Sequence, residues 1–312
     1  MSKGIIGSIC LLLAAGMWGG MYVVGKYVME YISPFVLLWF RYILAFSILW
    51  LFWFIKGKQK IERKDIALIV WLGFIGYIVS NACGFIGTHL SNAHIGALIS
   101  SSSPAFTLLL AYLLNKEPLS WRKVLSITLA TCGLFLVIGI GEGEGSASLF
   151  GNLILIIGAF SWALYSVNIK KISGKYSTLT ITTFSTGIAL IIITPVMLIN
   201  LEKQELLYLK EIPIQAGILY LGLFATAAAF YLWNKGMEMM EAGIGSIFYF
   251  FTPVISGFFG FIFLEEKISN SFIAGGLLIL IGIVLPFLKN TKILRKSSVI
   301  EIQNENMQEN KV

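Results

Sequence analysis

The amino-acid sequence predicts an all-α, polytopic membrane protein with ten transmembrane helices arranged as two inverted five-helix repeats. Three observations predict this fold class: ten long apolar stretches, an uneven distribution of Lys and Arg among the loops, and an internal duplication. The 312 residues are 57% hydrophobic and 12% charged, with a mean hydropathy of +0.84. Because soluble domains carry about 25% charged residues, this composition excludes a water-soluble fold.

The apolar stretches are the most direct sign of membrane spans, since a helix that crosses a bilayer needs about 20 predominantly apolar residues. Nine stretches lack Asp, Glu, Lys, Arg and His altogether: residues 4–25, 66–88, 95–115, 124–141, 145–169, 176–201, 212–234, 242–264 and 268–288. The tenth, residues 31–55, contains only Arg41 as a charged residue. These stretches predict a first five-helix domain over 4–141 and a second over 145–288. Residues 289–312 are polar and predict a disordered cytoplasmic tail.

The distribution of Lys and Arg predicts the orientation of the spans. With the N-terminus placed in the cytoplasm, 17 of these residues near the spans fall on the inner side and 4 on the outer side. The positive-inside rule then places both termini in the cytoplasm and the protein in the cell membrane as a multi-pass chain. The formal charge of +7 therefore reflects topology, and nucleic-acid binding is not indicated.

The two halves are related by an internal duplication. Trp18 and Lys26 recur as Trp162 and Lys170 at an offset of 144, and Gly96, Pro104, Glu117 and Gly133 recur as Gly245, Pro253, Glu266 and Gly282 at an offset of 149. Because each half has an odd number of spans, the second half enters the membrane in the opposite sense. Inverted repeats are typical of transporters, whose substrate site lies at the repeat interface near the bilayer midplane.

Pro104 and Pro253 lie close to the centres of the fourth and ninth spans, at the depth expected of such a site. A proline inside a helix leaves the carbonyl four residues earlier without its donor, which here is the carbonyl of Ser100 or Tyr249. The hydroxyls of Ser103 and Thr252 could satisfy the backbone or contact a ligand, and both interpretations remain open.

Several motifs resemble one known family. They are Pro34 followed by Arg41, Ser103-Pro104 followed by Glu117-Pro118-Leu119, Trp233-Asn234-Lys235, and Thr252-Pro253 followed by Glu266. With ten spans, they resemble the drug/metabolite transporter (DMT) superfamily, specifically EamA-type transporters with two EamA domains. The resemblance implies a ten-helix transporter with a central cavity between its halves. Such proteins are usually exporters of amino acids, other metabolites or toxic compounds.

The candidate cavity residues are aromatic or small and polar, and many share one helix face at a spacing of four, as Trp18 does with Tyr22 and Trp162 with Ser166. Aromatic rings with a few polar groups are typical of small-molecule sites, although buried aromatic packing gives the same pattern. The predicted substrate-binding residues are Trp18, Tyr22, Tyr77, Asn81, Ser100, Ser103, Pro104, Trp162, Ser166, Tyr249, Thr252 and Pro253.

Three charged residues are candidates for gating. Arg41 could attract a substrate carboxylate, snorkel to the interface or pair with another helix. Glu117 and Glu266 end their spans at matching repeat positions and could serve two gates. Alternatively, each ties its helix end to nearby cations, for example Glu117 to Arg122 or Lys123.

No cofactor or metal site is indicated. His89 and His94 lack nearby Cys or carboxylate residues, and the three cysteines show no metal-ligand spacing. The sequence therefore predicts a transporter that works by alternating access, with a small-molecule substrate and the lipid bilayer as partners. A membrane-embedded enzyme is the first alternative, but no catalytic motif supports it. A sensor or scaffold is the second, and the sequence leaves homo-oligomerisation open.

Overall fold

The structure, a computed structural model, describes residues 3–90, 99–138, 149–264 and 270–288. Within these ranges nearly every residue is helical, and the only β-type pairing is an isolated bridge between Ser173 and Tyr176. Glu266, His94 and the predicted tail 289–312 lie outside the described residues, as do the side chains of Tyr22 and His89.

The helices follow one another as the apolar stretches predict. The first half contains α1 (Lys3–Val28), α2 (Pro34–Ile55), α3 (Arg63–Leu72), η1 (Gly73–Val79), α4 (Ser80–Leu90), α6 (Ser103–Asn115) and α7 (Trp121–Ile138). The second half contains α8 (Leu149–Asn168), η2 (Ile169–Lys171), α9 (Thr178–Asn200), α10 (Glu205–Tyr208), α11 (Ile212–Leu219), η3 (Tyr220–Ala228), α12 (Ala229–Met239), α13 (Ala242–Ile247), η4 (Phe248–Phe250), α14 (Phe251–Leu264), α15 (Asn270–Val284) and η5 (Leu285–Phe287).

Eight helices among the described residues are long and apolar enough to cross a membrane. The other two predicted spans coincide with α6, a shorter apolar helix, and with α7. Many large apolar side chains on the outside of the bundle are exposed, among them Ile5, Trp50, Leu153 and Ile199. An apolar outer surface of this extent is what contact with lipid requires, because water would disfavour it.

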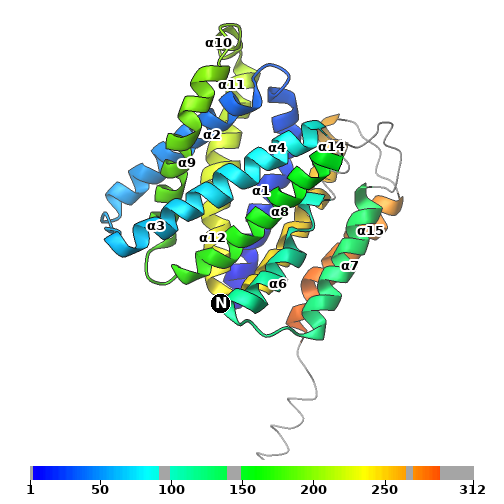
Figure 1. The fold of residues 1–312 in the computed structure, drawn as a ribbon. Coiled ribbons are helices and arrows are strands. Elements are labelled where there is room, and N and C mark those ends of the chain that lie inside the picture. Colours follow the sequence, from blue (N-terminus) through cyan, green and yellow to red (C-terminus); the bar gives the residue numbers. More distant parts are fainter. Residues whose placement is uncertain (1–2, 91–98, 139–148, 265–269, 289–312) are drawn as a thin grey trace, which may run out of the picture.

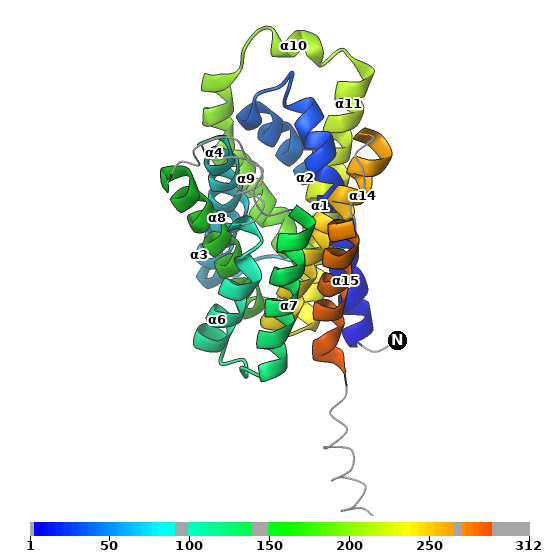
Figure 2. The same ribbon diagram turned by 90° about the vertical axis from the view of Figure 1, so that its right-hand side faces the viewer.

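The two halves interlock through their first helices. In the first half, α1 packs against α12 and α14 of the second, whereas α8 of the second half packs against α4 and α6 of the first. The remaining helices pair with their counterparts, α2 with α9 and α7 with α15; α7 and α15 lie side by side along one edge (Figures 1 and 2). The first helix of each half therefore lies within the other half.

The pairing of α7 with α15 depends on glycine. A Cβ atom added at Gly275 would lie 2.4 Å from the carbonyl oxygen of Gly133, and one added at Gly133 would lie 2.5 Å from that of Gly275. Real Cβ atoms do not approach a backbone oxygen so closely, so the two helices meet backbone to backbone. Small residues that allow close backbone approach are typical of helix pairs in membranes.

Two π-helices, η1 and η3, interrupt the third long helix of each half, at Gly73–Val79 and Tyr220–Ala228. Neither π-helix is predicted by the amino-acid pattern. A π-helical turn widens the backbone and leaves carbonyls without the usual donor four residues later, and π-bulges are frequent at functional sites. Here side chains supply the missing donors, as described below.

The two central prolines differ in their place in the helices. Pro104 follows a turn in which the Ser102 hydroxyl and amide both donate to the carbonyl of Ile99, at 2.6 and 3.0 Å, and it therefore lies in the first turn of a new segment, where its missing N–H is tolerated. Pro253 is the third residue of α14, but α13, η4 and α14 follow one another without a gap, so this proline lies inside a continuous helical span. The 3-10 segment η4 tightens the backbone just before it.

Candidate functional site

Five rings from four segments of both halves form an aromatic cluster: Trp18 of α1, Trp162 of α8, Phe230 and Trp233 of α12, and Tyr249 of η4. The ring of Trp18 touches the other four, with centroid separations of 5.2 to 5.9 Å. Trp162 also contacts Tyr249 at 6.1 Å and Trp233 at 5.7 Å. The structure thus brings together three residues that the sequence predicts, Trp18, Trp162 and Tyr249.

Sequence reasoning missed Phe230 and Trp233. These two residues lie three apart on α12, which places both rings on one helix face. The Trp233-Asn234-Lys235 motif was noticed only for its family resemblance, although an aromatic–polar pair inside an apolar span was itself a usable signal.

The indole nitrogens in the cluster have different surroundings. Trp18 donates from Nε1 to the carbonyl of Ala225 in η3 at 3.0 Å, so the ring is tied to the π-helix of the second half. Trp233 Nε1 is buried and has no hydrogen-bond partner in the described part of the chain. Since buried donors are almost always paired, an unpaired one in the centre of a helical bundle requires an explanation.

The hydroxyls of Ser103, Ser166 and Thr252 are in the same situation, buried and without a partner among the described residues. Ser166 follows Trp162 by one turn, and Thr252 follows Tyr249 by three residues, so both lie next to the cluster. All three residues were predicted to line the cavity. Ser100 and Pro253 are partly buried and Pro104 is buried.

A chain of buried hydrogen bonds extends from the cluster. Tyr77 of η1 stacks on Phe230 at 4.2 Å, and its hydroxyl lies 3.4 Å from that of Tyr165. Tyr165 donates to Asn234 Oδ1 at 2.6 Å, and Asn234 Nδ2 donates to Thr182 Oγ1 at 3.0 Å. This chain links the third helix of the first half to three helices of the second.

The side chains of Asn81 and Tyr42 donate hydrogen bonds to the backbone of the π-helix η1. Asn81 Nδ2 donates to the carbonyl of Tyr77 at 2.9 Å, and the Tyr42 hydroxyl donates to the same carbonyl. Asn81 was predicted to line the cavity, and its amide nitrogen is directed to the backbone of its own helix. This bond holds η1, which carries Tyr77, and the place of Asn81 in the cavity stays a prediction.

Arg41 is buried in α2, with only 3% of its surface exposed, so it does not snorkel to an interface. Its Nε donates to Thr226 Oγ1 in η3 at 3.1 Å, and Nη2 lies 3.2 Å from the sulfur of Met21. Thr226 directly follows Ala225, the acceptor of Trp18. The guanidinium group therefore joins α2 to η3 and to α1, where Met21 lies three residues after Trp18.

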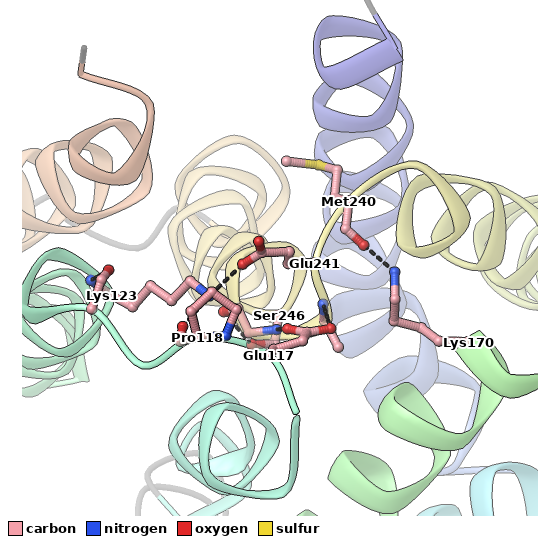
Figure 3. Close-up of polar contacts among 10 residues, drawn as sticks. Glu117, Pro118, Lys123, Lys170, Met240, Glu241 and Ser246 are labelled. Carbon is pink, nitrogen blue, oxygen red and sulfur yellow. Dashed lines mark hydrogen bonds and ion pairs between the residues drawn. The ribbon is translucent and has the colours of Figure 1, made fainter. Parts of the chain in front are cut away.

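A second set of polar contacts surrounds the turn between α12 and α13 (Figure 3). Glu117, after the end of α6, accepts hydrogen bonds from the backbone amides of Ala242 at 2.7 Å and Gly243 at 3.1 Å. Lys123 of α7 forms an ion pair with Glu241 and donates to the carbonyl of Pro118 at 2.7 Å. We call these contacts between the two halves, made by Glu117, Lys123 and Glu241, the turn contact.

The turn contact corrects one expectation. The sequence analysis offered Arg122 or Lys123 as the partner of Glu117, but its carboxylate instead binds the first amides of α13. Those amides have no acceptor within the helix, and the helix dipole favours a negative charge beside them. Arg122 donates to the carbonyl of Leu288.

Lys170 supports the same turn from within the second half. Its ammonium group donates to the carbonyls of Met237, at 3.1 Å, and Met240, at the C-terminal end of α12 (Figure 3). Met240 in turn lies against Gly7 of α1, where an added Cβ would be 2.9 Å from Met240 Cγ. The turn is therefore located at the end of the bundle where α1 begins.

The described residues contain no group of three or more His, Cys, Asp or Glu side chains that could hold a metal ion.

Comparison with known proteins places these features in a family. The sequence profile of the EamA-like transporter family matches residues 5–139 and again residues 149–288. The chain is 26% identical over 286 residues to the uncharacterized transporter YetK of Bacillus subtilis (strain 168), covering 90% of this chain and 86% of that protein. It is 28% identical over 298 residues to the uncharacterized transporter YyaM of the same organism, covering 93% of each.

A solved crystal structure has the same fold, with a TM-score of 0.76 at 17% sequence identity. The match covers 90% of this chain and 96% of that one, so the resemblance extends over both halves.

Proposed function

Because the chain belongs to the EamA-like transporter family, and is accordingly a multi-pass membrane transporter, we propose that it moves a small solute across the cell membrane by alternating access between two inverted halves. In this mechanism one half rocks against the other around a central site. We further propose export as the direction, with both termini in the cytoplasm, following the family resemblance and the 17-to-4 distribution of basic residues.

The inverted arrangement is supported by the reciprocal packing of the two halves. The first helix of each half packs on the third and fourth helices of the other, and the remaining helices pair with their counterparts. Such reciprocal contacts are expected if a twofold axis relates the halves. The matching positions of η1 and η3 in the third helix of each half support the same relation.

The aromatic cluster is the substrate site in this proposal. The observation that carries it is the buried Trp233 Nε1–H, which has no partner among the described residues although the ring contacts three other rings from both halves. A bound solute with a hydrogen-bond acceptor would satisfy this donor, and the Ser166 and Thr252 hydroxyls could donate or accept beside it. Flat or apolar solutes that carry an acceptor fit this combination of rings and hydroxyls best.

Arg41 contributes charge next to this site. Its guanidinium is fixed by Thr226 on the π-helix that also anchors Trp18, so a substrate carboxylate beside the cluster would be attracted to it. An intramembrane arginine held at a helix interface is a functional candidate by default, because its burial is costly.

Reconstitution tests the proposal. Purified protein in liposomes should move at least one member of a panel of amino acids, nucleosides and aromatic dyes, and the Trp233→Phe variant should move that solute with a raised KM. Trp50→Phe, on the lipid-exposed side of α2, is the matched control and should leave transport unchanged. Folded protein that moves no solute in the panel would contradict the transport function proposed for this chain.

A further inference from the structure

We propose that the turn contact is the cytoplasmic gate of this transporter: it closes one end of the path to the aromatic cluster and is broken when the site opens to that end. The inference rests on the proposed function, because a gate has a meaning only if the halves move against each other. The turn contact joins the end of α6 and the start of α7 in the first half to the start of α13 in the second (Figure 3).

The position of the turn contact supports this role. Trp162, Ser166 and Lys170 follow one another at intervals of four along α8 and η2, so they lie on one helix face. Trp162 belongs to the aromatic cluster, and Lys170 binds the same α12–α13 turn that Glu117 binds. The buried Ser166 therefore lies between the cluster and the turn contact. A solute leaving the cluster toward this end would pass it.

The chemistry of the turn contact suits repeated opening. Glu117 and Lys123 are buried in the closed state, whereas Glu241 is partly exposed. When the halves part, water can replace each hydrogen bond, so that the net change per bond is small even though the bonds are well made. An aromatic or aliphatic seal at this end would instead expose apolar surface to water each time it opened.

Gly243 leaves little space between α13 and α6. A Cβ atom at this position would lie 2.8 Å from Cδ1 of Leu108 on α6, and 3.7 Å from Glu117 Oε2. A larger residue would require the Leu108 side chain to move. The second half thus supplies two free amides and a glycine, and the first half supplies the carboxylate that binds between them.

The test measures access to Ser166 from the cytoplasmic side and needs no solute. Ser166→Cys is introduced into a chain whose three native cysteines are replaced by alanine, and reaction with a membrane-impermeant maleimide is timed. Labelling should be slow in this parent because position 166 is fully buried. Adding Glu117→Gln, which retains the shape but replaces one acceptor oxygen by a donor amide, should speed labelling at least about tenfold.

Glu238→Gln is the matched control. Glu238 lies at the same end of the bundle and binds Thr178 and Lys235, but all these contacts are within the second half. Its neutralisation should leave the labelling rate at position 166 within about twofold of the parent. An equal increase in both variants would overturn the inference, since it would indicate general loosening. Unchanged labelling in Glu117→Gln would overturn it as well.

A charge exchange gives a second readout that does not depend on how a single variant folds. Lys123→Glu and Glu241→Lys should each speed labelling, and the double variant should slow it again toward the parent rate. Failure of the double variant to slow labelling would contradict an ion pair across the gate. If Glu117→Gln opens access while no solute moves in liposomes, the turn contact closes this end of the bundle but the proposed transport is overturned. If a solute moves but Glu117→Gln leaves labelling unchanged, the gate alone is overturned.

Discussion

Two tryptophans in the aromatic cluster allow a direct comparison of a paired and an unpaired indole. Trp18→Phe and Trp233→Phe both replace a buried indole by the smaller phenyl ring. The two tryptophans are 4% and 0% exposed. In the first variant the carbonyl of Ala225 loses its donor, whereas in the second an unpartnered donor disappears. We expect Trp18→Phe to destabilise the protein more than Trp233→Phe.

The size of the difference follows from the hydrogen bond at 3.0 Å. Leaving a buried acceptor unpaired costs about 1 to 3 kcal/mol in proteins generally, while polar pairs between membrane helices average about 0.6 kcal/mol. A difference of about 1 kcal/mol in the free energy of unfolding lies between these values. It corresponds to roughly a fivefold difference in the unfolding equilibrium constant. The loss of ring volume is common to both variants and largely cancels.

Reversible unfolding in mixed micelles, titrated with a denaturing detergent, measures both free energies under the same conditions. Trp18→Ala is the reference for loss of the whole ring and should cost about 3 to 5 kcal/mol. The reasoning is refuted if Trp233→Phe proves as destabilising as Trp18→Phe, because the indole of Trp233 would then have a stabilising role in the empty protein.

Four further outcomes are expected. A double-mutant cycle of Tyr165→Phe and Asn234→Leu should give a coupling energy of about 0.5 to 1.5 kcal/mol in the same unfolding assay; additivity within error would contradict the buried bond. Arg41→Ala should lower the flux of a carboxylate substrate more than that of an uncharged one in liposomes, and equal loss for both would return Arg41 to a structural role. Gly275→Ala should cost about 1 to 3 kcal/mol by separating α7 from α15, whereas Gly16→Ala, where an added Cβ meets nothing within 4 Å, should be neutral or stabilising by unfolding titration. Hydrogen bonds from Lys64 and Lys175 lower the pKa of Glu62, so its stabilising effect is present above its ordinary pKa and is lost as pH falls through the lowered value. The unfolding temperature should therefore fall more in the wild type than in Glu62→Gln between about pH 6 and about pH 3, and parallel curves would exclude this contribution.

The sequence predicted the helical membrane fold because each span is a long apolar stretch, a signal that needs no tertiary information. It also predicted Trp18, Trp162 and Tyr249 at one site, since the duplication aligned two of them and Pro253 placed the third at midplane depth. These rings do meet in the structure. The sequence could not predict η1 or η3, because π-helical turns depend on donors from other helices, here Trp18 and Tyr42.

The hydrogen-bond partner of Glu117 could not be predicted from the sequence, because it too lies far along the chain. A carboxylate beside Arg122 and Lys123 suggests a local ion pair when only the sequence is known. The start of α13 lies 125 positions further along the chain, and backbone amides leave no trace in the amino-acid pattern. Likewise, the bond from Asn81 to the Tyr77 carbonyl could not be predicted, because a backbone acceptor cannot be recognised from residue types.

The paired π-helices also set how these long helices tolerate insertions and deletions. A residue removed from Gly73–Val79 would allow an ordinary α-helix and would leave the faces of α3 and α4 almost in register, because a π-helical turn holds one residue more than an α-helical turn. The Tyr77 carbonyl would then pair within the helix, and Asn81 and Tyr42 would lose the acceptor that they share. Each third helix thus carries an extra residue in η1 or η3 without turning the rest of the helix away from its partners.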